Sequence, residues 1–456
     1  MNKISNIVVN VCRIILAATL ILSGFVKAID PRGTQYKIED YLSALSLPGV
    51  MPEWMALTLS ILLSALEFCL GVFLLMAIHR RTVSRLTLLL MAFMTVVSLW
   101  LWIANPVSDC GCFGDAIHLT NGQTLLKNIV LLVAAIVVCW RPLSMVRFIS
   151  KTNQGIVINY TALFIVATSL YCLYNLPLFD FRPYHVGADI RKGMEIPETE
   201  EQPQFETTFI LEKDGERKEF TLDNYPDSTW TFIDSKTVMT REGYVPPIHD
   251  FSIERIDTGD DITEEVLADT SYTFLLVAPM LENASDSDFG EIDQIYEYSQ
   301  DNGYAFYCLT SSGDSGIERW RNLTGAEYPF CTCDATTLKT IIRSNPGLLL
   351  LKGGQVIRKW SHHFLPTTEA LSAPLHQLPI GHLPEESPLR KIAKILLSFA
   401  VPLLALTIAD RLWAWTRWLK RRRTTPKGQE DPKSPEGPDS PQSSKGPDSP
   451  DSPDSP

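Results

Sequence analysis

Two cysteines separated by a single glycine, Cys110, Gly111 and Cys112, are the residues of this sequence best suited to redox chemistry. They occupy a short polar loop between two long apolar segments, so both thiols are expected to be accessible at a membrane surface. Gly111 has no Cβ atom, and a turn there can bring the two cysteine Cα atoms within bonding distance. A disulfide in so small a ring is strained and easily reduced. The spacing therefore predicts a redox-active pair.

Two other interpretations of the pair remain open. A zinc ion or an iron-sulfur cluster needs four ligands, and no second pair lies nearby in the sequence, so no metal is expected. A purely structural disulfide would stabilise little, because the ring is short. Among the charged neighbours, Asp109 and Asp115 disfavour the thiolate, whereas Lys127 would lower a thiol pKa if it lies close.

The composition differs between the first third of the chain and the rest. The 456 residues are enough for several domains, and the 45% hydrophobic share is concentrated in the first third, ahead of a charged, strand-like middle. The formal net charge of −12, with no basic groove apparent, argues against a nucleic-acid partner. Nine cysteines give no disulfide framework by number alone.

Six apolar segments have about the 20 residues that a helix needs to cross a bilayer. We expect an all-α transmembrane bundle over residues 1–177, made of four helices and a fifth span, and a sixth span at 391–415. The first segment is interpreted as a retained span because it lacks a clear cleavage site. The six segments are Ile7–Val26, Met55–Ile78, Leu86–Ile103, Leu125–Trp140, Val157–Leu176 and Ile392–Trp415.

Lysine and arginine clusters in short connections predict the orientation. Residues 79–85, residues 141–151 and residues 420–423 carry these clusters, and all three fall on one side if every apolar segment spans. Both termini are then cytoplasmic, and residues 178–390 lie on the outer, disulfide-permitting side of a bacterial inner membrane. The expected partners are the lipid bilayer and a periplasmic client or redox-partner protein.

Two charged residues stand inside these predicted spans. Lys27 ends the first span and is interpreted as reaching, or snorkelling, to the outer interface. Glu67 lies near the middle of the second span, where a carboxylate is costly, so it should be protonated or paired. Its role is open between proton or quinone handling and a hydrogen bond between helices. Of the span cysteines, Cys172 could approach the Cys110 and Cys112 loop, and the others, Cys12, Cys69 and Cys139, are expected in the core.

The outer region divides into a small β layer and an α/β unit. Residues 178–245 form a β-rich linker region, with a hairpin between Phe205–Leu211 and Arg217–Leu222. Strands and helices then alternate over residues 246–370, which predicts parallel strands closed by a terminal hairpin. Residues 424–456, rich in Pro, Ser and Asp, are expected to be a disordered cytoplasmic tail.

This order of elements, with Pro346 entering the hairpin, resembles the thioredoxin fold, in particular its TlpA-like and peroxiredoxin-like members. The resemblance implies a cis peptide bond at Asn345–Pro346 and a catalytic Cys pair after the first core strand. Residues 278–284 hold no cysteine there. Cys331 and Cys333 are a candidate second pair, rather far apart for a bond along a strand, and core packing is the alternative. Cys308 is expected in the core.

The membrane part resembles the DoxX/MauE group of redox-associated membrane proteins. The resemblance is carried by residues 23–28 (SGFVKA), by Glu67, and by residues 110–115 (CGCFGD) with Lys127 and Asn128. It implies methylamine utilisation, through maturation of a disulfide-rich periplasmic subunit, or thiosulfate oxidation with quinone as the acceptor.

We therefore expect a multi-domain membrane protein that relays electrons between Cys110 and Cys112 and an outer thiol or client, with the thioredoxin-like domain presenting that client. Glu67 and Lys127 would tune the pair. No cofactor is evident, although a quinone at the membrane end stays open. The alternatives are a non-catalytic assembly factor with a static bond, and a quinone-linked DoxX-type subunit.

Overall fold

The computed structural model describes residues 3–107, 111–200, 204–213, 216–221, 230–241, 243–385 and 387–424. Cys110 and Asp109, which the redox prediction names, lie outside these described residues, as does the predicted tail beyond residue 424.

Six helices carry the long apolar segments. Each contains a stretch long and apolar enough to cross a membrane, which confirms the six predicted spans and makes this a multi-pass membrane protein. Apolar side chains such as Leu89 and Ile103 are 71% exposed, as expected of surfaces that face lipid. The helices are α1 (Lys3–Ile29), α3 (Glu53–Met76), α4 (Arg80–Ala104), α5 (Asn121–Trp140), α6 (Gln154–Tyr174) and α12 (Pro388–Thr424).

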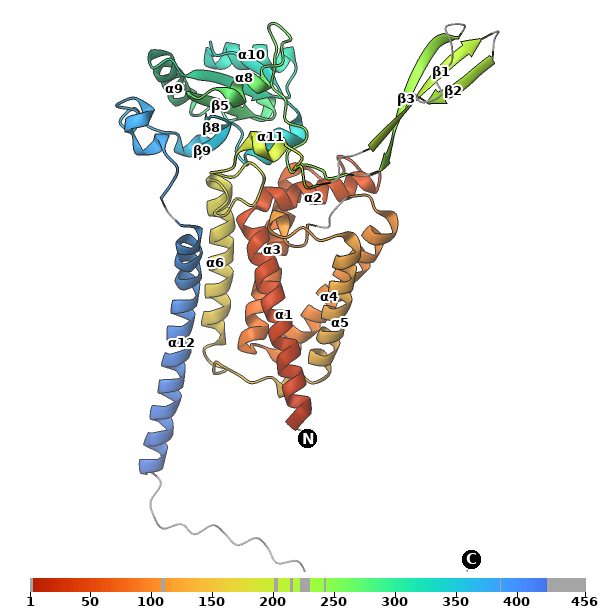
Figure 1. Ribbon diagram of the computed structural model, residues 1–456. Coiled ribbons are helices and arrows are strands. Elements are labelled where there is room, and N and C mark those ends of the chain that lie inside the picture. Colours follow the sequence, from red (N-terminus) through yellow and green to blue (C-terminus); the bar gives the residue numbers. More distant parts are fainter. Residues whose placement is uncertain are drawn as a thin grey trace, which may run out of the picture. The chain divides into compact units, whose positions relative to one another are not determined.

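Five of these helices pack side by side (Figure 1). Helix α1 packs on α3 and α5, α4 packs on α5, and α6 packs on α3 and α1. The connection between α5 and α6, which includes η2 (Pro142–Ser144), is held by two arginines. Arg13 donates to the carbonyls of Val146 and Leu75, and Arg80 donates to the carbonyls of Leu143 and Met145.

Pro402 lies inside α12. Proline has no backbone N–H, so the carbonyl of Ser398, four residues earlier, loses its helical partner. The hydroxyl of Tyr160 on α6 lies 3.0 Å from this carbonyl and 3.2 Å from that of Phe399, so its one proton is shared between them. A freed backbone group inside a membrane protein is thereby satisfied from a neighbouring helix.

A shorter helix that the sequence analysis did not predict, α2 (Pro31–Ala44), follows α1 directly. Asp30 is its N-cap and accepts a hydrogen bond from the Gly33 backbone at 3.0 Å, while Pro31 occupies the first helical position. The hydroxyl of Ser60 on α3 donates to the Pro31 carbonyl at 2.7 Å, which fixes the start of α2 on the bundle.

The first sheet has three antiparallel strands in the order β2-β1-β3. The predicted hairpin is present, because Phe209 of β1 pairs with Phe220 of β2. The strands are β1 (Gln204–Lys213), β2 (Glu216–Thr221) and β3 (Thr231–Arg241).

The second sheet has six strands in the order β4-β7-β6-β5-β8-β9. Strands β5, β6 and β7 are parallel, β8 pairs antiparallel with β5, and β9 pairs antiparallel with β8. A mixed strand and helix region is thus confirmed. The strands are β4 (Glu254–Arg255), β5 (Tyr272–Ala278), β6 (Ala305–Thr310), β7 (Phe330–Thr332), β8 (Gly347–Lys352) and β9 (Gln355–Ser361).

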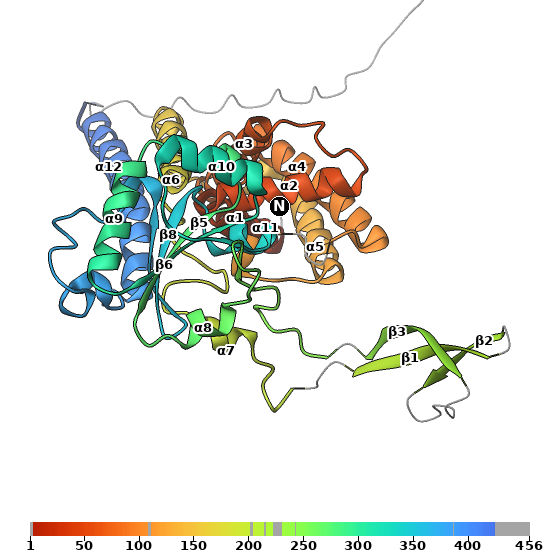
Figure 2. The same ribbon diagram turned by 90° about the horizontal axis from the view of Figure 1, so that it is seen from above.

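Helices cover both faces of this sheet (Figure 2). Every residue of β5 is buried, and alternate side chains point to opposite faces: Phe274 packs with α9 and α10, whereas Leu275 packs with α8 and α11. The helices of this unit are α7 (Ile190–Met194), α8 (Thr263–Ala268), α9 (Phe289–Asp301), α10 (Asp314–Thr324) and α11 (Ala335–Ile341). Its short 3₁₀ turns are η4 (Leu281–Asn283), η5 (His362–Phe364), η6 (Leu375–Gln377) and η7 (Pro379–Gly381), whereas η1 (Gly114–Ala116) lies between α4 and α5.

Candidate functional site

The site begins where α1 and α3 approach each other through glycines. A Cβ atom on Gly24 would lie 2.4 Å from the backbone nitrogen of Phe68, and one on Gly71 would lie 2.8 Å from the nitrogen of Ile21. Such distances are too short for any side chain, so only glycine fits at either position. Small residues of this kind let two membrane helices pack backbone to backbone.

This close approach places Lys27 of α1 against Glu67 of α3. The Lys27 ammonium lies 2.7 and 2.9 Å from the two carboxylate oxygens, and the side chains are only 6% and 3% exposed. The prediction that Lys27 reaches the outer interface is therefore wrong, because a buried carboxylate provides a closer partner than the headgroup region. Glu67 is paired with Lys27, which is one of the two states predicted for it.

Ser23 connects this ion pair to the cysteine loop. Its hydroxyl lies 2.7 Å from Glu67 Oε2 and 2.7 Å from the carbonyl oxygen of Cys112. Ser23 and Lys27 are four residues apart and so share one face of α1. The backbone of the loop at Cys112 is thus connected through Ser23, by two hydrogen bonds, to a buried pair of charges.

The loop itself turns on two glycines with positive φ. Gly111 has φ of +58° and Gly114 has φ of +52°, and the Gly114 amide donates to the Gly111 carbonyl at 3.0 Å. A Cβ on Gly111 would lie 3.1 Å from the side chain of Lys37, so the aliphatic part of this α2 lysine covers the turn. The turn predicted to bring Cys110 and Cys112 together includes Cys110, which lies outside the described residues, so it stays a prediction.

Lys127, predicted as a neighbour of the cysteine pair, lies beside the next residue of the loop. Its ammonium is 4.4 Å from the centre of the Phe113 ring, and Phe113 is buried. A cation over an aromatic face is attracted by the ring quadrupole. The structure therefore places Lys127 next to the loop through Phe113.

An arginine of the α/β unit, Arg343, contacts both Asp30, at the start of α2, and Asp115, in the cysteine loop. Arg343 Nη2 lies 2.9 Å from a carboxylate oxygen of Asp30 and 3.4 Å from one of Asp115. Burial alone would raise the pKa of Asp30, but the adjacent Arg343 guanidinium outweighs it and holds that pKa below its ordinary value. For Asp115 burial prevails, and its pKa is raised despite Arg343.

A second group of charges lies where the chain leaves α6. Asp180 accepts from Arg182 Nε at 2.7 Å and from Lys359 Nζ of β9 at 2.9 Å. Burial lowers the pKa of Lys359 to about 8, although Asp180 opposes this shift. The pKa of Asp180 is depressed, since Lys359 and Arg182 together outweigh its burial.

Two cavities share lining residues of α1. One of about 560 Å³, called the polar cavity for its charged side chains, is lined by Lys27, Lys37, Gly111, Asp115 and Arg343, among others. An apolar cavity of about 340 Å³ lies among α1, α3, α6 and α12, with Phe25, Phe68, Phe164 and Phe399 in its wall. Val26 and Ile29 line both cavities, so the two are neighbours.

The remaining predicted positions lie elsewhere. Cys331 and Cys333 both carry free thiols, and burial raises the pKa of each to about 12. Cys308 and Cys172 are also free and buried. The Asn345–Pro346 peptide bond is cis.

Residues 5–141 match the family model described as methylamine utilisation protein MauE, and residues 205–242 match a domain of unknown function, DUF8463. The first match covers α1, α3, α4 and α5 and confirms the predicted resemblance to MauE for this part; its extension to DoxX remains a prediction. No curated protein matches the chain. A solution structure titled as a putative protein disulfide isomerase from Bacteroides thetaiotaomicron is similar at 16% identity, over 25% of this chain and 76% of that one. Its TM-score of 0.21 carries no argument.

Sequence reasoning missed Ser23 as a separate site residue, although the residue stands in the SGFVKA segment. It also missed Asp30 and Arg343, which are 313 positions apart. Asp30 followed by Pro31 was a readable helix-start signal, but nothing in the local sequence marks Arg343 as its partner.

Proposed function

We propose that this protein is a thiol-disulfide exchange factor of a bacterial inner membrane, which uses Cys110 and Cys112 to oxidise or reduce partner proteins on the outer side. The match of residues 5–141 to the MauE family supports a role in maturing such partners, as in methylamine utilisation. The lysine and arginine clusters support cytoplasmic termini and a periplasmic location for residues 178–390.

The observation that carries the proposal is the hydroxyl of Ser23 between Cys112 and Glu67. A hydroxyl has one proton, so Ser23 donates to only one of the two oxygens that lie 2.7 Å away. The hydroxyl thereby links the Cys112 backbone to the Lys27 and Glu67 ion pair. Exchange with a client disulfide passes the two electrons of the dithiol, and overall its two protons, to the two client thiols, and the Glu67 carboxylate, two hydrogen bonds from the loop through Ser23, can hold one of these protons in transit.

The outer α/β unit is proposed to be a thioredoxin-like domain that binds the client. The order β6-β5-β8-β9, with β5 parallel to β6 and antiparallel to β8, supports this fold, as does the cis bond before β8. Residues 278–284 after β5 hold no cysteine. The contacts of Arg343 with Asp30 and Asp115 support a domain held beside the cysteine loop, where tethering raises the local concentration of a bound client.

The apolar cavity favours a second candidate, a quinone-linked oxidoreductase. Its aromatic wall suits an isoprenoid chain or a quinone ring, and its shared lining with the polar cavity would bring a polar head toward Lys27 and the loop. A quinone would then take the two electrons and two protons of the Cys110 and Cys112 dithiol. Reduction of a short-chain quinone by the dithiol form of the protein in nanodiscs tests this acceptor.

Thiol trapping in intact cells tests the proposed function. Maleimide-polyethylene glycol should reveal both reduced and oxidised Cys110 and Cys112, and Cys112→Ser should trap a mixed disulfide between Cys110 and a client. Cys139→Ser, a change on α5, is the matched control and should leave both populations as they are. A pair locked in one state, with client output unchanged in Cys112→Ser, would point instead to a static assembly factor.

The orientation needs its own test. A membrane-impermeant maleimide added outside spheroplasts should label the reduced loop, and a background of Cys308→Ser, Cys331→Ser and Cys333→Ser removes the three thiols of the outer domain. If the loop is labelled only after permeabilisation, although the outer domain is accessible from outside, the loop lies on the cytoplasmic side. That result would contradict the proposal.

A further inference from the structure

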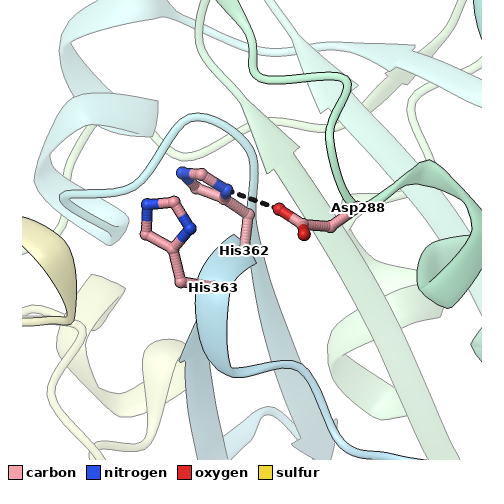
Figure 3. A group of neighbouring side chains, drawn as sticks. All are labelled: Asp288, His362 and His363. Carbon is pink, nitrogen blue, oxygen red and sulfur yellow. Dashed lines mark hydrogen bonds and ion pairs between the residues drawn. The ribbon is translucent and has the colours of Figure 1, made fainter.

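Three side chains of the outer α/β unit converge at a place that the cysteine chemistry does not use (Figure 3). Asp288 precedes α9, and His362 and His363 belong to η5, which follows β9. One ligand atom of each residue lies within 4.8 Å of the others. The Asp288 carboxylate is 2.9 Å from His362 Nδ1, and the two imidazole rings lie 3.7 Å apart, centre to centre.

The side chain of Asp288 does not cap α9, although Asp288 occupies the N-cap position. It occupies the N-cap of α9, where an aspartate usually accepts a hydrogen bond from the first turn, yet it makes no such bond. Its carboxylate accepts instead from Ser287 Oγ at 2.6 Å and contacts His362. The helix thus forgoes a cap, and the carboxylate is turned toward the imidazoles.

Both histidines are held by further contacts. The backbone amide of His362 donates to Ser344 Oγ at 3.2 Å, and that hydroxyl donates to the carbonyl of Pro346. The ring of His363 stacks on Tyr174 of α6, with centres 4.0 Å apart and planes 11° from parallel. Ligands that are oriented by surrounding groups before an ion arrives bind it more tightly.

We propose that Asp288, His362 and His363 form a binding site for one divalent transition-metal ion. Imidazole nitrogens with one carboxylate are ligands suited to Zn²⁺ and its first-row neighbours, whereas Ca²⁺ and Mg²⁺ prefer all-oxygen sites. Ligand atoms on a tetrahedral ion with bonds of about 2.0 to 2.1 Å lie roughly 3.3 Å apart, so modest side-chain rotations close the site. Three protein ligands leave a fourth position for water or another ligand.

Sequence reasoning could not find this site. Asp288 and His362 are 74 positions apart, and two adjacent histidines match no metal-binding spacing by themselves. Only the fold, which ends β9 beside the start of α9, brings them together.

Zn²⁺ titration of the purified full-length chain, without a histidine tag and after chelator treatment, tests the proposal. We expect the wild type to bind one Zn²⁺ per chain at these residues. His363→Ala and Asp288→Asn should each weaken this binding at least tenfold. Calorimetry and metal analysis after dialysis measure the affinity and the bound Zn²⁺. His363→Ala keeps the contact between Asp288 and His362. Without metal, its melting temperature should therefore equal that of the wild type, which would show that the variant is folded. His376→Ala, which removes an exposed histidine, is the matched control and should bind like the wild type.

Co²⁺ provides an independent readout, because cysteine thiolates give an intense charge-transfer absorption that nitrogen and oxygen ligands lack. Bound Co²⁺ should show only the weak bands of a nitrogen and oxygen site, and these should disappear in His363→Ala. Equal Zn²⁺ binding in wild type, His363→Ala and Asp288→Asn, a thiolate spectrum, or no binding by the wild type would each overturn the proposal.

Discussion

The buried pair of Lys27 and Glu67 gives a prediction whose magnitude can be worked out. Lys27→Met keeps the length of the side chain but removes its charge, and leaves Glu67 without the ammonium that lies 2.7 Å away. At an effective dielectric constant of about 20, the lost attraction is roughly 6 kcal/mol. Desolvation of both charges opposes it, and removing one partner of a buried pair typically costs about 3 to 5 kcal/mol.

Glu67 stays buried in Lys27→Met without the charge that pairs with it. We therefore expect this substitution to lower the free energy of unfolding by about 3 to 5 kcal/mol.

Unfolding of the purified protein in mixed micelles, titrated with sodium dodecyl sulfate and followed by circular dichroism of the helices, measures these quantities. Lys27→Met, Glu67→Gln and the double variant complete a double-mutant cycle. The double variant should be more stable than the sum of the single losses implies, because it leaves no charge unpaired. Additive losses, or a Lys27→Met cost below about 1 kcal/mol, would refute the reasoning.

Three further predictions follow from single features of the structure. Gly24→Ala should cost about 1 to 3 kcal/mol in the same unfolding assay, because its Cβ would meet α3 backbone at 2.4 Å, whereas Gly155→Ala, with nothing within 4 Å, should be neutral or slightly stabilising. Stability of the outer α/β unit should rise with pH between about 8 and 10.5, since folded Lys359 loses its proton before the unfolded residue does; Lys359→Met should abolish this rise in a pH series of melting curves. Cys331 and Cys333, buried and with pKa values of about 12, should resist maleimide at pH 7 until urea unfolds the domain, and rapid native labelling would restore the second redox pair as a serious interpretation.

The sequence was sufficient wherever a pattern is local. Apolar length predicted the six membrane helices, and alternation of strands and helices predicted the second sheet, including β5, β6, β8 and β9 within a residue or two. These signals depend on the burial of a whole segment, which many side chains report together. Helix α2 was missed because it is short and polar, although Asp30 and Pro31 marked its start.

Single charged residues were harder, since their state depends on partners that the sequence does not reveal. Lys27 at the end of an apolar segment looks the same whether it reaches the headgroups or meets a carboxylate. The deciding residue is Gly24, whose missing side chain lets α3 come close enough for Glu67 to be that carboxylate. Arg343 and the group of Asp288 with two histidines depend in the same way on contacts across the fold.

Little more than one turn of α1 contains Ser23, Gly24 and Lys27, and each of them makes a different contact. Gly24 sets the distance to α3, Lys27 neutralises Glu67, and Ser23 holds the Cys112 carbonyl. Because α1 is a rigid helix, a change that moves it away from α3 alters all three contacts together. The position of the cysteine loop is therefore coupled to helix packing inside the membrane, and Gly24 should affect the proposed thiol exchange of the loop as strongly as the charged residues beside it.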